Sequence, residues 1–502
     1  MNRKMVFYML GQILKLEAAL LSLPLLCSVI YSEKEVFSIL ITIAVALALG
    51  FILTVFNKAK DKTVYAKEGF VIVALSWLVL SAIGALPFVI SGAIPSYVDA
   101  FFETVSGFTT TGASILPNVE SITSKGLLFW RSFTHWIGGM GVIVLIMAIV
   151  PTDSGRSIHI MRAEMPGPIV GKLVPKLKST AKILYLIYIA LTFLQVVLLC
   201  LGDMSLYESL IHAFGTAGTG GFGIKADSIA SYSPYIQWVI TIFMLIFGVN
   251  FNLYYLILIR KFANVIKSEE LWTYIILVLA SVGLVTYNIY PSYKNIGEAI
   301  RLSAFQVSSI ITTTGYATAD FNMWPSLAKA ILFILMFIGA CAGSTAGGLK
   351  ISRIVLVFKN IRVNLKHMLH SRSVESVRFE GARVEKDTIV GTLGYLAVYL
   401  FCFTAIFLLL SFEPFDLETN ISAVTACFNN VGPGFEGVGP TSSYAAYSAF
   451  SKVLLSFAML LQASTSSALG KYFSGAQAVK LRPSFAQPTM SELPILYLAS
   501  PI

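Results

Sequence analysis

Charged residues are scarce in this sequence. They make up 12% of the 502 residues, whereas hydrophobic residues make up 56%, and the mean hydropathy is +0.78. A water-soluble domain cannot bury that much apolar surface, so the composition excludes a soluble globular protein. It predicts instead a protein that crosses a membrane several times.

Cysteine and histidine are also few, and neither forms a pattern of known chemistry. No CxxC pair occurs, and most of the five cysteines lie in apolar runs, as small buried hydrophobes do. The five histidines show no HExxH spacing, and no nucleophile–base pair is evident. We therefore expect neither an enzyme nor a bound cofactor. A cleavable signal pattern is missing too, so the first apolar run is expected to remain as a span.

Apolar runs near the roughly 20 residues that a bilayer demands are abundant. Ten candidate spans fall at about 6–31, 36–56, 70–92, 126–150, 181–201, 234–259, 272–290, 325–349, 388–412 and 444–470. From the third span onward, a polar segment too short to cross lies within each successive pair of spans. Such a segment is tolerated at membrane depth only where protein or a water-filled cavity surrounds it.

Each of these four segments reaches a glycine in a similar way. They read FTTTG at 108–112, AGTGG at 217–221, ITTTG at 311–315 and FNNVG at 428–432. Short helices are expected just before them, at about 97–108, 205–217, 296–310 and 418–428. Four ordinary glycine-containing loops are the alternative, but the same motif at the same place in four units favours four in-chain repeats around one pore.

The motif composition suits an ion filter. An ion that enters a pore loses its water, and backbone carbonyls can replace those oxygens without adding net charge. Glycine permits a positive φ and a close approach, and threonine or asparagine side chains can hold the turn. Helix C-termini aimed at the axis would add partial negative charge that favours a cation.

The distribution of charge predicts the orientation. With the N-terminus inside, the inner loops and tails hold 27 Lys and Arg and the outer segments hold five, together with 14 of the 26 acidic residues. The net charge of +10 is therefore a topology signal and an attraction to anionic lipid, and no nucleic-acid partner is expected. The acidic outer face, including Asp99, Glu103, Glu208, Asp416, Glu418 and Glu436, would concentrate cations. Nine basic residues within 350–386 could dock an acidic or nucleotide-binding cytosolic partner, or only set topology and contact lipid.

Two further stretches carry information. Residues 339–350 contain Gly339, Gly343, Gly347 and Gly348, which are costly in a helix, so the stretch is either a close packing surface or a break that forms a gate under the filter. Lys350 could be a mobile charge there or a cytoplasmic anchor at the end of the span.

The second stretch, 130–141, opens the fourth span. Its tryptophans suit an interfacial belt, and its glycines would allow tight packing behind the filter. Arg131 is expected to pair with an outer carboxylate, and His135 to have a hydrogen-bonded packing role rather than proton chemistry.

The motifs WRSFTHWIGGMGV, TTTGAS, TAGTGGFG, TTTGYAT, NNVGPGFEGVGP and GSTAGGLK resemble the TrkH branch of the Trk/Ktr/HKT potassium-transporter superfamily over roughly residues 1–461. The resemblance implies an all-α polytopic protein of the bacterial inner membrane, with four span–pore-loop–span pseudo-repeats around one pore plus two N-terminal helices. It implies K⁺ as the transported ion, which glycine rather than serine at Gly112 supports. It also implies a homodimer with a cytosolic, nucleotide-binding, TrkA-like regulatory subunit.

The resemblance assigns residues to the two parts of the pore. The K⁺ filter would consist of Thr110, Thr111, Gly112, Thr219, Gly220, Gly221, Thr313, Thr314, Gly315, Asn430, Val431 and Gly432. The gate would consist of Gly343, Ser344, Thr345, Gly347, Gly348 and Lys350. The expected division is 1–68 for the added helices, 69–155, 178–265, 270–350 and 387–470 for the repeats, 351–386 for a basic cytoplasmic linker and 471–502 for an atypical tail.

One departure from the family concerns the last span. The family continues there as a GRLEI-like stretch whose arginine faces the pore opposite the gate, whereas this chain reads QASTSSALGK from Gln462. No arginine matches, and that role is assigned to no residue. A cation symporter coupled to Na⁺ or H⁺ is the alternative function, although it would need ionisable groups at mid-membrane.

Overall fold

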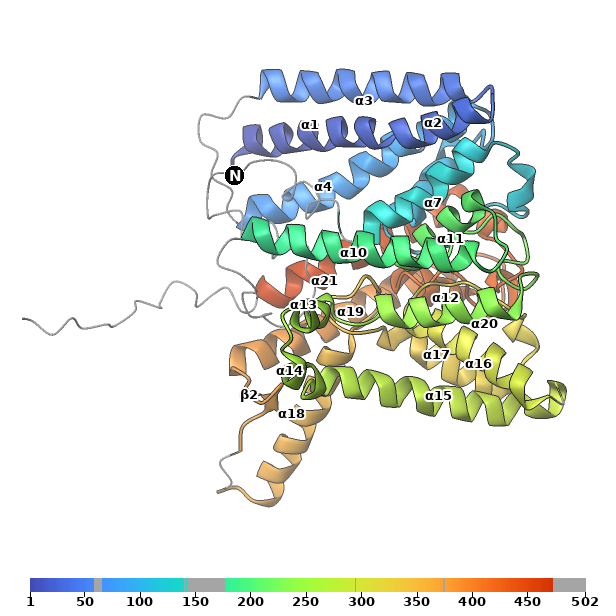
Figure 1. Cartoon of the computed structure of the whole chain (residues 1–502). Helices are drawn as coiled ribbons and strands as arrows, with labels where there is room; N and C mark the ends of the chain where they lie inside the picture. Colours follow the sequence, from blue (N-terminus) through green and yellow to red (C-terminus); the bar gives the residue numbers. More distant parts are fainter. Residues whose placement is uncertain (58–65, 140, 142–176, 294, 373–374, 473–502) are drawn as a thin grey trace, which may run out of the picture.

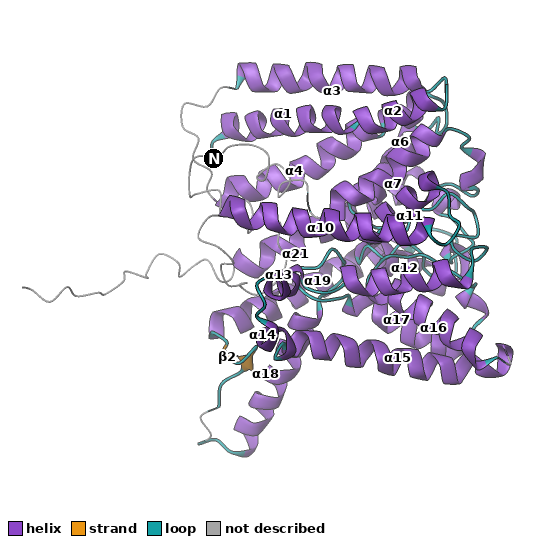
Figure 2. Cartoon of the chain, in the orientation of Figure 1, coloured by secondary structure: helices purple, strands orange, loops and turns teal. Residues whose placement is uncertain are grey.

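The computed structural model describes residues 1–57, 66–139, 141, 177–293, 295–372 and 375–472. Apart from the two-residue strands β1 (Arg378–Phe379) and β2 (Ala382–Arg383), the regular elements of this part are helices. Most long helices run along one common direction, and irregular loops gather at one end of the bundle (Figures 1 and 2). The expected all-α class is therefore confirmed.

The added N-terminal pair forms one edge of the bundle. Helices α1 (Arg3–Leu20) and α2 (Ser22–Ile30) make up the first span, and α3 (Val36–Phe56) lies against α1 (Figure 1). The two helices approach closely at Gly11 and Gly50, where a Cβ on Gly11 would lie 2.9 Å from the Gly50 carbonyl oxygen. Small residues at this crossing allow the close packing typical of membrane helices.

The remaining helices form four successive units. Their bounds are α4 Ala66–Gly84, α5 Leu86–Ile90, α6 Tyr97–Phe108 and α7 Lys125–Gly139; α10 Leu177–Cys200, α11 Leu206–Ala217, α12 Pro234–Phe247, α13 Phe251–Leu258 and α14 Phe262–Ile266; α15 Glu269–Tyr293, α16 Ile296–Ile311, α17 Ser326–Ile338 and α18 Ile351–Leu369; and α19 Lys386–Leu410, α20 Leu417–Phe428 and α21 Ala449–Tyr472. The short helices expected before the four glycine motifs are α6, α11, α16 and α20, each within two residues of its expected bounds.

Single 3-10 turns occur in the outer loops, at Val119–Ser121, Phe321–Met323, Glu436–Val438 and Tyr444–Ala446. Side-chain caps start all four short helices. Ser96, Ser205 and Asp416 each accept a hydrogen bond from the backbone N–H three residues on, and Asn295 accepts one from the Gly297 N–H. In α11 the cap is reciprocal, because Glu208 also reaches back to the Ser205 backbone.

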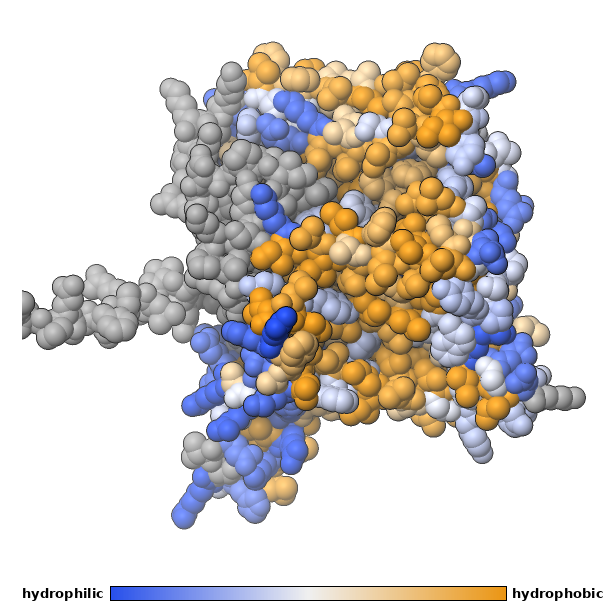
Figure 3. Space-filling model, viewed as in Figure 1, coloured by the Kyte–Doolittle hydropathy of each residue, from blue (hydrophilic) through white to orange (hydrophobic). Residues whose placement is uncertain are grey.

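The exterior of the bundle is apolar around its middle, as the orange band in Figure 3 shows. Six helices in the described residues are long and apolar enough to cross a membrane, or seven if α12 and α13 count as one bent span. The expected span at 126–150 lies partly outside the described residues, and the last expected span appears as the shorter apolar helix Ala449–Ala463.

Two expected spans are not continuous. The run 234–259 breaks between α12 and α13 with a bend of 90°. The run 325–349 is helical only as far as Ile338, and the chain then loops before α18 leads away from the bundle (Figure 1). The first break was not predicted from the sequence, in which only residues 339–350 indicated an interruption.

Candidate functional site

The four short helices end in the same turn. Thr110, Thr219, Thr313 and Asn430 all have a left-handed backbone, with φ between 55° and 57°. The next residue then donates its N–H to the carbonyl five residues back, over 2.9 Å from Thr111 to Ser106 and 2.8 Å in each of the other repeats. This is the Schellman pattern, which turns the chain away from the helix axis. A non-glycine residue in this conformation costs roughly 1 kcal/mol or more, so the surrounding structure must hold it.

The four glycines that follow form a closed ring. Gly112, Gly221, Gly315 and Gly432 have φ values of 82°, 75°, 82° and 100°. Each Cα lies against the carbonyl oxygen of the residue before the glycine in the next repeat, and the fourth glycine lies against the first repeat. A Cβ at any of these glycines would overlap that oxygen. The ring therefore requires glycine four times, for conformation and for space.

Side chains brace the segments from behind. The hydroxyl groups of Thr109 and Thr111 are 2.9 Å apart, and those of Thr312 and Thr314 are 2.8 Å apart. Asn430 closes the ring between the last and first repeats, since its Nδ2 donates to the Thr109 carbonyl over 3.0 Å and to the Thr111 hydroxyl over 2.7 Å. The twelve residues predicted as the filter are thus brought together at one place.

A buried ion pair supports the outer side of this ring. Arg131 Nε lies 2.6 Å from Glu103 Oε1, which confirms the expected outer carboxylate partner. Glu103 also accepts from the Ile115 N–H over 2.9 Å, and Arg131 donates to the Gly223 carbonyl over 3.1 Å. Because both ions are buried and further hydrogen-bonded, the pair fixes the segments that follow the filter glycines of repeats 1 and 2 relative to each other.

The acidic residues at the outer face are partly neutralised. Lys452 lies 2.7 Å from Asp99, and Lys329 lies 3.2 Å from both Glu418 and Glu436. With Glu103 paired to an arginine as well, four of the six carboxylates named from the sequence have a cationic partner. Attraction of cations by this face is therefore weaker than the acidic count alone indicates.

Residues 339–350 form a loop directly beneath the ring. The backbone is left-handed at Gly339, Gly343, Gly348 and, without glycine, Lys350. The Gly347 N–H donates to the Thr313 hydroxyl over 2.7 Å, and the Gly348 N–H donates to the Asn429 carbonyl over 3.1 Å. Freed backbone groups of the loop are thus satisfied by the underside of repeats 3 and 4, as membrane depth requires.

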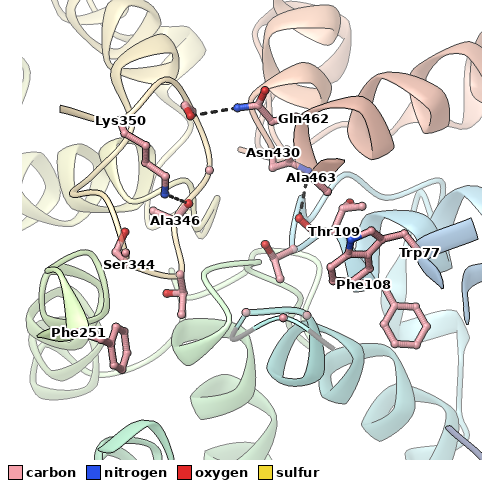
Figure 4. A pocket seen from close by; sticks show the side chains of 18 of the residues that line it. Trp77, Phe108, Thr109, Phe251, Ser344, Ala346, Lys350, Asn430, Gln462 and Ala463 are labelled. Atoms are coloured by element: carbon pink, nitrogen blue, oxygen red, sulfur yellow. Dashed lines mark hydrogen bonds between the residues drawn. The ribbon is translucent and has the colours of Figure 1, made fainter. Parts of the chain in front are cut away.

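A cavity of about 130 Å³ lies between the ring and this loop. Its lining includes Thr110 and Asn430 above and residues 343–348 below, and Figure 4 shows Lys350 and Gln462 at its edge. The Gln462 amide donates to the Gly348 carbonyl over 3.0 Å, and Lys350 donates to the Ala346 carbonyl. Lys350 is 1% exposed, so its interpretation as a cytoplasmic anchor is wrong.

The loop has further supports that the sequence did not indicate. Glu270, at the start of α15, accepts from the Ala342 N–H over 2.7 Å and from the Ser352 N–H over 3.2 Å. The break between α12 and α13 forms two hydrogen bonds with the loop. The Cys341 N–H donates to the Gly248 carbonyl, and the Phe251 N–H donates to the Gly343 carbonyl, each over 3.1 Å. Gly248, which caps α12, and Asn250, which caps α13, were the signals for this break in the sequence.

These features define the class of the protein. It is an all-α, multi-pass membrane transport protein, with four pore-loop repeats that meet on one axis and a loop beneath them. The matching family model, described as a cation transport protein, covers residues 35–462. The chain belongs to this family, the TrkH family. The match ends where the sequence departs from the expected last span.

Similar proteins agree over most of the chain. The Trk system potassium uptake protein TrkH of Escherichia coli strain K12 is 34% identical over 443 residues, which cover 86% of this chain and 91% of the relative. TrkG of the same strain is 30% identical over 465 residues, covering 91% and 95%. The crystal structure of the potassium transporter TrkH from Vibrio parahaemolyticus matches with a TM-score of 0.82 at 29% identity, covering 97% of this chain and all of that one.

Proposed function

We propose that this chain takes up K⁺ across the bacterial inner membrane through a gated, selective pore. The observation that carries the proposal is the closed ring, in which each filter glycine lies against a carbonyl oxygen of the next repeat. Carbonyl oxygens from four repeats can replace the water of a monovalent cation and still release it. The relatives named as potassium uptake proteins support K⁺ as that cation.

The filter and gate follow from this proposal. The twelve residues predicted from the motifs form the filter, and residues 343–350 form the gate, with Lys350 as a charge that moves when the loop moves. Four repeats surround the pore, at 69–155, 178–265, 270–350 and 387–470. The added helices of 1–68 precede them, and the linker of 351–386 joins the third repeat to the fourth. The expected tail at 471–502 lies, from residue 473 on, outside the described residues.

The assembly extends beyond one chain. A Trk system has several components, and the proposal includes a second copy of this chain and a cytosolic, nucleotide-binding, TrkA-like subunit. The cytoplasmic side offers a surface for that subunit in α18, which extends away from the bundle (Figure 1) and carries Lys359, Arg362 and Lys366.

The test is transport by purified protein in liposomes. Liposomes loaded with K⁺ should take up external ⁸⁶Rb⁺. External K⁺ should compete with this uptake more effectively than Na⁺, and the TrkA-like subunit should change its rate. Uptake that does not distinguish K⁺ from Na⁺ would contradict the proposal.

An H⁺-coupled symporter is the second candidate, because a carboxyl group is buried within the first expected span. Glu17 in α1 is 1% exposed, and neither carboxyl oxygen has a hydrogen-bond partner among the described residues. Intramembrane carboxyl groups mark proton paths in many transporters. Uptake that follows an imposed pH gradient in wild type, and loses this dependence in Glu17→Gln, would favour symport over a passive pore.

A further inference from the structure

The second repeat lacks the side chains that brace the other filter segments. Repeats 1 and 3 use threonine pairs, and in repeat 4 the Tyr399 hydroxyl donates to Asn429 over 2.6 Å. The corresponding positions in repeat 2 are Gly218 and Gly220, which have no side chain. Neither of them has a positive φ, so their backbone conformation does not require glycine.

One residue of the first repeat occupies both vacant places. A Cβ on Gly220 would fall on the imidazole ring of His135, with Nδ1, Cε1 and Cγ as its three nearest atoms. A Cβ on Gly218 would overlap the His135 carbonyl group and lie 3.0 Å from the His135 Cβ. These two glycines are therefore required by space alone, because His135 occupies the place that a side chain would fill.

His135 belongs to a face of α7 that follows the second filter segment. One turn before it, Arg131 bonds to Gly223, and one turn after it, Gly139 packs on Gly218. The His135 ring is 0% exposed and stands edge-on to Phe222, with the ring centres 4.2 Å apart. Neither ring nitrogen has a hydrogen-bond partner among the described residues, so the predicted hydrogen-bonded role is not what holds the ring. Packing against Gly218, Gly220 and Phe222 holds it.

We propose that His135 is the positioning residue of the second filter segment, doing from the neighbouring helix what threonine side chains do from within repeats 1 and 3. The proposal rests on the proposed K⁺ filter and names one residue that sets its selectivity. The imidazole keeps the Gly220 carbonyl, which faces Gly112, in its place in the ring. If the ring is removed, that carbonyl can move back from the ion, and the filter should accept Na⁺ more readily.

The steric exclusion provides the test. The experiment compares three variants in liposomes loaded with K⁺: His135→Ala, Gly220→Ala and the double variant. Uptake of ⁸⁶Rb⁺ is measured with external K⁺ and Na⁺ as competitors. His135→Ala should lower the preference for K⁺ over Na⁺ by roughly tenfold, equivalent to about 1.4 kcal/mol. Gly220→Ala should abolish uptake, because its methyl group has no room. The double variant should recover uptake and most of the preference, because the methyl group then fits where the ring was.

Controls separate this role from general packing. Trp136→Phe changes the next residue of α7, which faces Tyr188 and Thr192 instead of the filter, and should keep the wild-type preference. If His135→Ala does not fold, His135→Asn takes its place in the experiment. The single and double variants at His135 and Gly220 are then compared by thermal stability instead of uptake. The inference is wrong if Gly220→Ala lowers uptake equally with His135 and with alanine at that position. It is also wrong if His135→Ala keeps the wild-type preference for K⁺ over Na⁺. A wild-type protein without preference for K⁺ would instead overturn the proposed function.

Discussion

Replacing Gln462 by leucine should open the pore in the absence of any partner. Gln462 is 2% exposed and donates to the Gly348 carbonyl over 3.0 Å, from the last span to the loop beneath the filter. Leucine has a similar volume but no donor, so the change removes this bond and little packing. The bond belongs to the position of the loop that the structure describes, and we expect an open position to break it, so that the change weakens the closed state alone.

The expected size follows from one lost hydrogen bond. A net value of about 1 kcal/mol is typical of a buried neutral bond. A change of that size shifts an equilibrium by roughly fivefold, since 1.4 kcal/mol corresponds to tenfold. If the loop is closed most of the time, ⁸⁶Rb⁺ uptake into liposomes without partner should rise by the same factor. The preference for K⁺ over Na⁺ should not change, because the carbonyl ring lies above the loop.

Gln195→Leu is the matched control. Gln195 in α10 is also buried, but its amide has no hydrogen-bond partner among the described residues. It should leave uptake unchanged. If Gln462→Leu inserts in wild-type amounts and its uptake stays at or below the wild-type rate, the bond does not hold a gate, and the reasoning fails.

Three further predictions concern the filter, the gate and the cytoplasmic face. Gly315→Ser should weaken the preference for K⁺ over Na⁺ more than it lowers expression, because its Cβ would overlap a carbonyl of the fourth repeat; an unchanged preference in folded protein would place residue 315 outside the filter. Deletion of 343–347 should raise partner-independent uptake with the preference kept, and uptake at or below wild type would mark a packing surface. Neutralising Lys359, Arg362 and Lys366 should weaken low-salt pull-down of an acidic partner. The two lysines already pair within the chain, so Arg362→Gln alone should account for most of that loss, and equal binding would reject docking here.

The four short helices and their turns could be predicted because their signals are local. Caps such as Ser205 with Glu208 start them, and a threonine or asparagine followed by glycine ends them within five residues. The four-fold recurrence of this pattern then indicated a common axis. No single motif would have done so.

The breaks in the spans depend on partners that are distant in sequence. The run 234–259 is mostly apolar and is typical of one straight helix, yet it bends at Gly248 because the loop after Ile338 satisfies the freed backbone groups. Glu270 was missed as a support of the loop for the same reason. Its two backbone donors lie 72 and 82 residues further along the chain.

Lys350 was ambiguous for a different reason. At the end of an apolar run, a lysine is usually an anchor at the membrane surface. The reversal at Gly339 and Gly348 instead turns the chain back toward the filter, so that the side chain ends beside the cavity. The glycine content indicated a break, but the direction of the chain after the break depends on tertiary contacts.

A ring of four equivalent backbones has no means of closing itself, so control must come from what differs among the repeats. The third repeat supplies a loop that bonds upward to Thr313 and Asn429. The second supplies a break that bonds to the same loop, and His135 of the first packs against a segment in which positions 218 and 220 have no side chain. We therefore expect selection by the ring and closure by the loop to depend on different residues, apart from Thr313, which the two share. Changes in 343–350 should alter rate without ion preference, and changes at His135 should alter preference with the gate intact.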